Sequence, residues 1–127
     1  MEFKYMRIQG REISFVTKRP KGIFAMCWRM IYDGLMEQED AELFENINQW
    51  FEENLPNPEV CQSGNQAVIT YFKVSNTKHM IEKIEPAMRL LEKYNHPYDV
   101  VYTNFVGTIV YEDNWQVAVK VENGRMV

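Results

Sequence analysis

Cys61, His96 and Asp99 are the residues whose types could support nucleophilic catalysis in this chain. A cysteine thiolate becomes an effective nucleophile when a histidine takes its proton and a carboxylate orients the imidazole ring. Cys61 lies near Gly64 in a predicted loop, where a thiolate would be exposed. Three such residues occur by chance in most chains of this length, so the trio alone does not predict an enzyme.

The histidines and glycines do not form a recognisable metal or nucleotide motif. The two histidines, His79 and His96, are 17 residues apart, and neither has a Cys, Asp or Glu partner at a known metal-ligand spacing. The six glycines are scattered and form neither a P-loop nor a Gly-x-Gly-x-x-Gly turn. We therefore expect no metal and no cofactor, and we assign no catalytic residue.

Charge is distributed unevenly along the chain, and this is the strongest functional signal in the sequence. Residues 1–29 hold seven basic and two acidic residues, whereas residues 30–72 hold nine acidic residues and no Lys or Arg. Residues 73–127 hold seven of each kind, and the whole chain has a net charge of −4. A surface of one sign attracts an oppositely charged partner and orients it.

The acidic segment contains a predicted amphipathic helix from Gln38 to Asn54. Its apolar residues recur at i, i+3, i+4 and i+7, and Pro56 blocks extension. The opposite face carries the residues that we predict to bind a partner, namely Glu39, Glu42, Glu45, Gln49, Glu52 and Glu53. We expect a small non-catalytic binding protein of the inhibitor, immunity or adaptor type, whose acidic helix face docks on a basic protein. The simpler interpretation is a soluble face, which the basic first third of the chain could also neutralise.

A second candidate site is the basic turn that precedes a predicted helix beginning at Ile23. Its residues are Lys18, Arg19, Lys21 and Gly22. Free N–H groups at a helix start, the positive end of the helix dipole and three basic side chains would together hold a phosphate or carboxylate. The alternative function is therefore a small-ligand or nucleotide-binding protein, which could be an enzyme. A solvated basic turn without a ligand is again the simpler interpretation.

Several classes of partner and location are disfavoured by composition. The chain has no run near the roughly 20 apolar residues that a bilayer span needs, so we expect no membrane partner. A pI near 5.2 argues against direct binding of duplex nucleic acid. A start without a hydrophobic signal segment and a count of two cysteines predict a reducing, cytoplasmic setting. An oligomer-forming structural subunit stays open as a third possibility.

The first half of the chain predicts a hairpin followed by two helices. Aromatic and β-branched residues over 3–8 and 12–17, separated by a turn at Gly10, predict the hairpin, and Pro20 then places an exposed loop. Helices over Ile23 to Tyr32, ended by Gly34 as the C′ residue, and Gln38 to Asn54 are expected to pack antiparallel.

The second half predicts a strand over 67–74 and then a helix from an N-cap at Asn76 to about Tyr94, which Pro86 should kink or divide. Strands over 98–103, 108–111 and 115–121 follow.

The last two predicted strands permit a register argument. A three-residue loop, Glu112-Asp113-Asn114, would pair Tyr111 with Trp115 and would place Asn114 in the left-handed conformation.

The order ββααβαβββ predicts an α+β fold, with a mostly antiparallel sheet and helices on one face. The strand over 67–74, the following helix and the strand over 98–103 could form its single βαβ unit. With 127 residues, 46% of them hydrophobic, the chain can bury one core, so we expect one domain over residues 1–127.

Overall fold

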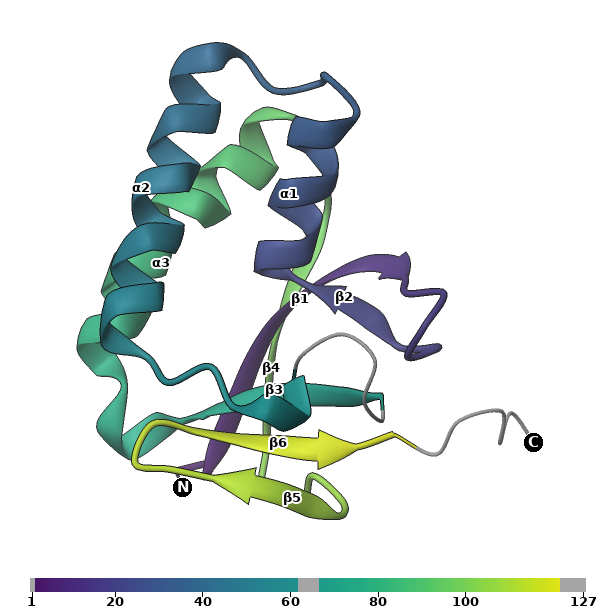
Figure 1. Ribbon diagram of the computed structural model, residues 1–127, viewed down its shortest axis with the longest axis vertical. Helices are drawn as coiled ribbons and strands as arrows, with labels where there is room; N and C mark the ends of the chain where they lie inside the picture. Colours follow the sequence, from purple (N-terminus) through teal and green to yellow (C-terminus); the bar gives the residue numbers. More distant parts are fainter. Residues whose placement is uncertain (1, 62–66, 122–127) are drawn as a thin grey trace.

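The computed structural model describes residues 2–61 and 67–121, and it has the predicted α+β class and the element order ββααβαβββ (Figure 1). The strands are β1 (Tyr5–Ile13), β2 (Pro20–Gly22), β3 (Val68–Lys73), β4 (Tyr98–Thr103), β5 (Ile109–Glu112) and β6 (Gln116–Lys120). The helices are α1 (Ile23–Tyr32), α2 (Gln38–Asn54) and α3 (Lys78–Lys93), with short 3-10 turns η1 (Glu59–Cys61) and η2 (Val74–Asn76).

The sheet is antiparallel throughout its described part, and three strands share β1 as their neighbour. One side of β1 pairs with β4 from Tyr5 to Gly10. The other side pairs with β3 at Tyr5 and Met6 and with β2 from Gln9 onward. The sheet therefore divides beside the middle of β1. Figure 1 shows β3, β6 and β5 running across the bottom of the molecule while β1 and β4 rise toward the helices.

The predicted βαβ unit forms with a strand inserted in it. Strands β3 and β4 both run antiparallel to β1, on its two sides, so they are parallel to each other. Helix α3 connects them, which makes a split βαβ crossover. Pro86 lies inside α3 and does not divide the helix.

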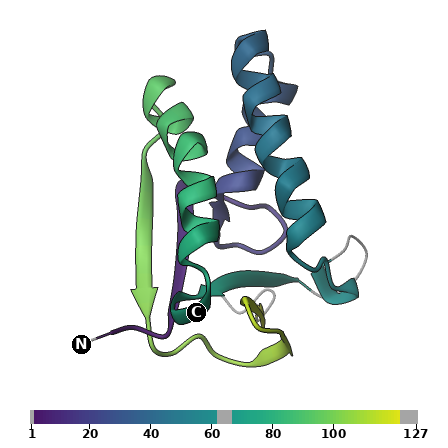
Figure 2. The same ribbon diagram turned by 90° about the vertical axis from the view of Figure 1, so that its left-hand side faces the viewer.

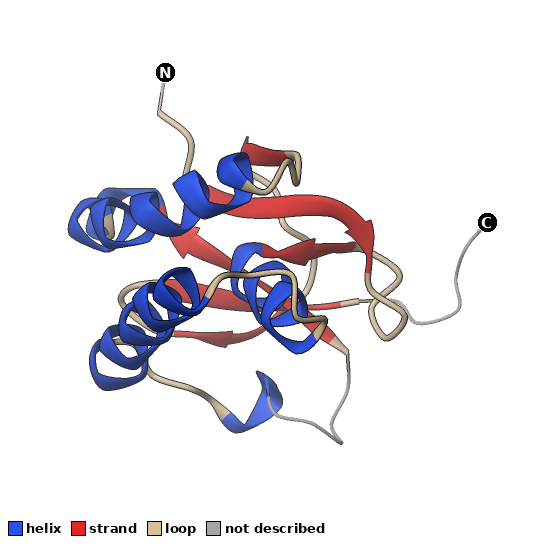
Figure 3. Cartoon of the chain, turned by 90° about the horizontal axis from the view of Figure 1, so that it is seen from above, coloured by secondary structure: helices blue, strands red, loops and turns tan. Residues whose placement is uncertain are grey.

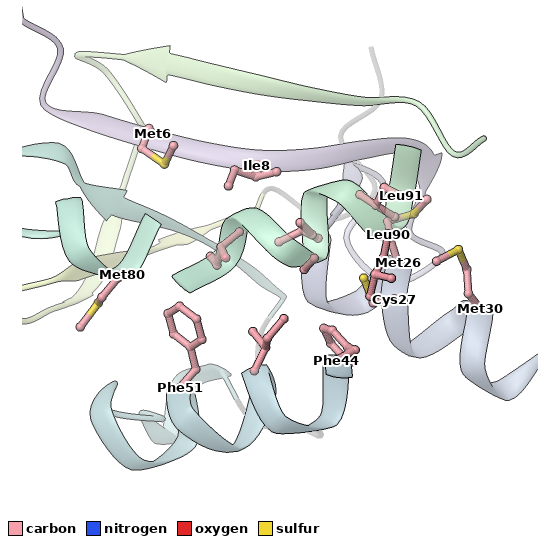
Figure 4. Packing of buried hydrophobic residues seen from close by; sticks show 14 residues of the cluster. Met6, Ile8, Met26, Cys27, Met30, Phe44, Phe51, Met80, Leu90 and Leu91 are labelled. Atoms are coloured by element: carbon pink, nitrogen blue, oxygen red, sulfur yellow. The ribbon is translucent and has the colours of Figure 1, made fainter. Parts of the chain in front are cut away.

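The core lies between the sheet and the three helices. Figure 4 shows Phe44 and Phe51 pointing from α2 toward α3, and both side chains are buried. Each helix contacts the other two, and the view from above shows them grouped over the strands (Figure 3). Figure 2 shows all three helices on the same side of β4, which agrees with the predicted helices on one face. Burying each large apolar side chain contributes about 1.5–3 kcal/mol.

The predicted hairpin at the start of the chain is wrong, because Gly10 lies inside one long strand. Residues 5–13 form β1, and Gly10 pairs with Tyr98 of β4. A Cβ atom at Gly10 would lie 2.7 Å from the sulfur of Met26 on α1. The glycine therefore allows close helix packing rather than a turn.

The predicted loop around Pro20 is also wrong, because Pro20–Gly22 form the short edge strand β2. An edge position suits proline, which lacks an N–H to donate. Both helices that follow have the predicted ends, 23–32 and 38–54. Gly34 has φ of +70°, and its N–H binds the carbonyl of Ile31, so its prediction as the C′ residue of α1 is confirmed.

Hydrogen bonds between side chains and the backbone explain two further wrong predictions, the N-cap of α3 and the loop of the last hairpin. The residue before α3 is Thr77, not Asn76, and the Asn76 side chain instead donates to the carbonyl of Asn114 at 2.6 Å. In the last hairpin, Asp113 Oδ1 accepts the N–H groups of Trp115 and Gln116 at 2.8 and 2.9 Å.

This Asp113 turn replaces the predicted loop and changes the register. Tyr111 pairs with Ala118 rather than Trp115, a bulge lies between Ile109 and Tyr111, and Asn114 does not have the positive φ that was predicted.

Candidate functional site

The acidic face of α2 is one continuous exposed stripe. It consists of Glu39, Glu42, Glu45, Gln49, Glu52 and Glu53, all of which are exposed. Phe44, Ile47 and Phe51 occupy the opposite, buried side of the same helix. At 1.5 Å per residue the stripe is about 21 Å long.

Three of the five glutamates of the acidic face accept hydrogen bonds within their own helix. Glu42 accepts from Gln38 at 3.2 Å, Glu52 from Asn48 at 3.2 Å and Glu53 from Gln49 at 3.4 Å. Among the described residues, none of the five glutamates forms an ion pair with a lysine or arginine. The basic first third of the chain therefore does not neutralise this face by direct pairing.

Three bases of the first third pair with acids elsewhere. Arg11 binds Asp99, Arg29 binds Asp33, and Lys21 binds Glu12.

Asp40 is the acidic residue of α2 that is used inside the fold. Its carboxylate accepts from Lys93 Nζ at 2.7 Å and from the Tyr94 hydroxyl at 2.5 Å. These hydrogen bonds, the one from Lys93 first, hold the pKa of Asp40 below its ordinary value. The Tyr94 hydroxyl oxygen also accepts the backbone N–H of Glu37 at 2.9 Å. The contacts fasten the start of α2 to the end of α3.

The structure separates the four residues of the predicted basic turn. Lys18 has φ of +60°, and its Nζ lies 4.3 Å from the centre of the Phe15 ring. Arg19 Nη1 donates to the carbonyl of Lys18 at 3.3 Å. Lys21 and Gly22 border a cavity whose lining does not include Lys18 or Arg19.

This cavity has a volume of about 400 Å³ and lies where the sheet divides beside β1. Its walls come from β1, the turn before β2, β2 itself, the first turn of α1, η1 and β3. Apolar side chains make much of the lining, among them Ile8, Ile23, Phe24, Leu55 and Phe72. No Asp or Glu belongs to it in the described part of the chain.

Arg7 is the charged side chain at the centre of this arrangement, and it is 9% exposed. Its Nη1 donates to the carbonyl of Thr70 on β3 at 3.0 Å, and its Nη2 donates to the carbonyl of Pro20 on β2 at 2.9 Å. Its Nε donates to Gln9 Oε1 at 3.1 Å. The guanidinium therefore joins the two strands that share one side of β1.

The charge of Arg7 has no acidic partner among the described residues. Burial lowers the pKa of its guanidinium from the ordinary value, while Tyr71 acts in the opposite direction. Arginine nevertheless stays protonated at neutral pH. A buried charge of this kind is costly unless something compensates it.

Sequence reasoning did not single out Arg7. Arg7 lies between Met6 and Ile8 in a strand, and the alternation of polar and apolar residues there is typical of a solvent-facing arginine. The burial arises because β2 and β3 approach β1 from distant parts of the chain. The position of an arginine between two apolar residues, Met6 and Ile8, was the only local signal.

The structure does not join the possible catalytic trio by any hydrogen bond or ion pair within the described residues. Asp99 binds Arg11 at 3.2 Å, and the His96 N–H binds the carbonyl of Leu91 at 2.9 Å. Burial, with a smaller effect of Asp113, raises the pKa of the Cys61 thiol. A raised pKa favours the protonated thiol, which is the weaker nucleophile.

The described residues also contain neither a metal-ligand cluster nor a helix that could span a membrane. No group of three or more His, Cys, Asp or Glu side chains in 2–61 and 67–121 could hold a metal ion. In the same ranges, no helix has the length and apolar character needed to cross a bilayer. No family model, curated protein or solved structure matches this chain.

Proposed function

We propose that this chain is a small non-catalytic binding protein that docks through the acidic face of α2 on a basic protein. The observation that carries the proposal is the exposure of all five glutamates without an ion pair to any described base. An inhibitor, immunity protein or adaptor works in this way when it covers the basic surface of its target.

The rigid support of the acidic face favours binding over a merely solvated helix. Phe44 and Phe51 anchor the opposite side of α2 in the core, and the Asp40 contacts fasten its start to α3. The charges are therefore held in a fixed pattern before a partner arrives, which reduces the ordering cost of association. Such a field speeds encounter and sets orientation more than it adds affinity.

We also propose that the protein acts in the cytoplasm. Cys27 and Cys61 are both free, which supports a reducing compartment.

Charge reversal on the acidic face tests the proposal. The full chain serves as bait in a lysate of its native cell, and a basic protein that binds it in stoichiometric amount is then purified. Glu45→Lys combined with Glu52→Lys should slow association with that protein by at least tenfold at low salt. The rate for the unchanged chain should fall as salt is added, because screening weakens charge steering.

A matched control carries the same change in net charge at another place. Glu2→Lys with Glu82→Lys alters two exposed acids outside α2 that form no ion pair with a described base, and association should stay within about twofold of the unchanged chain. Equal effects of the two double variants would show that net charge alone matters and would contradict the proposal. A lysate that yields no stoichiometric basic protein would contradict it as well.

A further inference from the structure

We propose that the cavity beside Arg7 binds a small organic monocarboxylate with an apolar body, whose carboxylate pairs with the Arg7 guanidinium. This is a second site, separate from the acidic face of α2, and it is independent of the function proposed above. It rests on a cavity, on a buried cation that has no acid partner among the residues the structure describes, and on the start of α1 beside them.

Arg7 has unused capacity to hold an anion. A guanidinium carries five N–H donors, and the three hydrogen bonds to described residues use one on each nitrogen. One N–H on each terminal nitrogen is left for a further acceptor. The three acceptors already bound are neutral oxygens of Gln9, Thr70 and Pro20, so they satisfy geometry without cancelling the charge.

The first turn of α1 adds to the same positive site. Ile23, Phe24 and Ala25 line the cavity, the helix has no acidic residue in its first turn, and Gly22 provides no side-chain cap. Free backbone N–H groups at such a helix start favour an anion. A Cβ atom at Gly22 would lie 3.4 Å from Arg7 Nη2, which is an ordinary contact distance, so the guanidinium lies directly beside the start of α1.

The balance of charge around the cavity selects the class of anion. Lys21 also borders the cavity, but its ammonium is paired with Glu12. Arg7 therefore supplies one uncompensated positive charge, which a singly charged carboxylate matches. A phosphate dianion would bring surplus negative charge into a mostly apolar space. A volume of about 400 Å³ lined by aliphatic and aromatic side chains suits a compact apolar body.

The test measures thermal stabilisation and calorimetric affinity with defined probes at neutral pH. The probes are sodium acetate, butyrate and hexanoate, the neutral hexanamide, and inorganic phosphate. We expect the melting temperature to rise with ligand concentration, most for hexanoate and least for acetate, because binding to the native state stabilises it. Hexanamide and phosphate should bind at least tenfold more weakly than hexanoate.

Two variants and a control assign the effect to Arg7. Arg7→Met should weaken hexanoate binding at least tenfold. Gln9→Glu should do the same in a chain that keeps Arg7, because it places a carboxylate on Nε at the position of the Gln9 oxygen. Arg11→Met, which alters an exposed arginine on the same strand, should leave the affinity unchanged.

The role of Arg7 can be tested even if Arg7→Met fails to fold, because Gln9→Glu neutralises the same positive charge in a chain that keeps Arg7. Equal binding of hexanamide and hexanoate, or unchanged affinity in Gln9→Glu, would overturn the role of Arg7. Stronger binding of phosphate would overturn the proposed ligand class, and no response to any carboxylate would overturn the site.

Discussion

The acidic face of α2 and the Arg7 cavity handle unpaired charge in opposite ways. The acidic face spreads five negative charges over an exposed helix surface, where each side chain is accessible to solvent. The cavity holds one positive charge that is 9% exposed and has only neutral hydrogen-bond acceptors in the described structure. Solvated surface charges cost the fold little, whereas a buried unpaired charge costs several kcal/mol.

Because of this difference, the two regions provide unequal evidence of function. Many soluble proteins carry an acidic helix face, so the indication of a partner comes from exposure combined with the absence of ion pairs to the described bases. A buried cation without an acid is uncommon, and it calls for a compensating role even when it is a single residue. The number of charges is therefore a poorer guide than their surroundings.

The largest effect should come from Arg7→Ala. This change removes the donors to the carbonyls of Pro20 and Thr70 and so breaks the bridge between β2 and β3, although each strand keeps its backbone pairing with β1. The three hydrogen bonds already offset much of the cost of the buried charge, and each acceptor left without a donor costs about 1–3 kcal/mol, so the free energy of unfolding should fall by about 2 kcal/mol. Urea denaturation measures it. Arg11→Ala on the same strand should change it little, and equal losses in the two variants would erase the distinction between buried and exposed charge.

A smaller gain should follow from Gln9→Glu, which gives the buried charge a partner. A charge-assisted bond is about twice as strong as a neutral one, but repulsion from Asp99, the cross-strand neighbour, reduces the benefit. We expect about 0.5–1 kcal/mol of added stability at pH 7, measured by urea denaturation.

This gain from Gln9→Glu should have a defined pH dependence. Pairing with Arg7 lowers the pKa of the new carboxyl in the folded state, so the gain is present above about pH 4.3 and is lost as pH falls through the folded pKa. A gain that persists at pH 2 would show that the pairing is not electrostatic.

Asp40 is an acid of α2 that is ion-paired with Lys93, in contrast to the glutamates of the acidic face. Its folded pKa is lowered, first by the hydrogen bond from Lys93. Its contribution to stability is therefore full above the unfolded pKa of about 3.9 and is lost as pH falls through the lower folded value. Unfolding curves of the unchanged chain and of Asp40→Asn should converge as pH is lowered through this range. Curves that stay parallel down to pH 2 would contradict the assignment.

The smallest effect on stability should come from the acidic face itself. Glu45→Lys with Glu52→Lys changes two exposed side chains, of which Glu52 has one hydrogen bond, from Asn48. Thermal unfolding should indicate a change within about 0.5 kcal/mol. A larger loss would mean that these glutamates serve the fold, and the comparison with Arg7 would then reverse.

Local signals predicted the helices well and the strands less well. The ends of α1 and α2 agree with the sequence prediction because periodicity, Gly34 and Pro56 act within a few residues. The hairpin error at Gly10 arose because the reason for that glycine is Met26, which packs on it from another element. The Asp113 turn depends on side-chain bonds whose geometry the sequence pattern does not reveal.

The two candidate sites differ in the same respect. The acidic face occupies one helix, so its residues could be named from composition and spacing alone. The Arg7 cavity gathers residues from β1, β2, α1 and β3 around a division in the sheet. The sequence placed Gly22 and Lys21 near a possible anion site, but it did not indicate the arginine that the structure buries there.

The pairing of β1 with β4, which is distant in the sequence, affects how the chain folds during synthesis. Tyr5 pairs with Thr103, so it leaves the ribosome long before its partner residue is synthesised. At 5–20 residues per second, β1 waits roughly 5–20 s for β4. During that time β1 can pair with β2 and β3 on one side only, so the side that β4 later covers is an unpaired strand edge, which favours aggregation of the nascent chain.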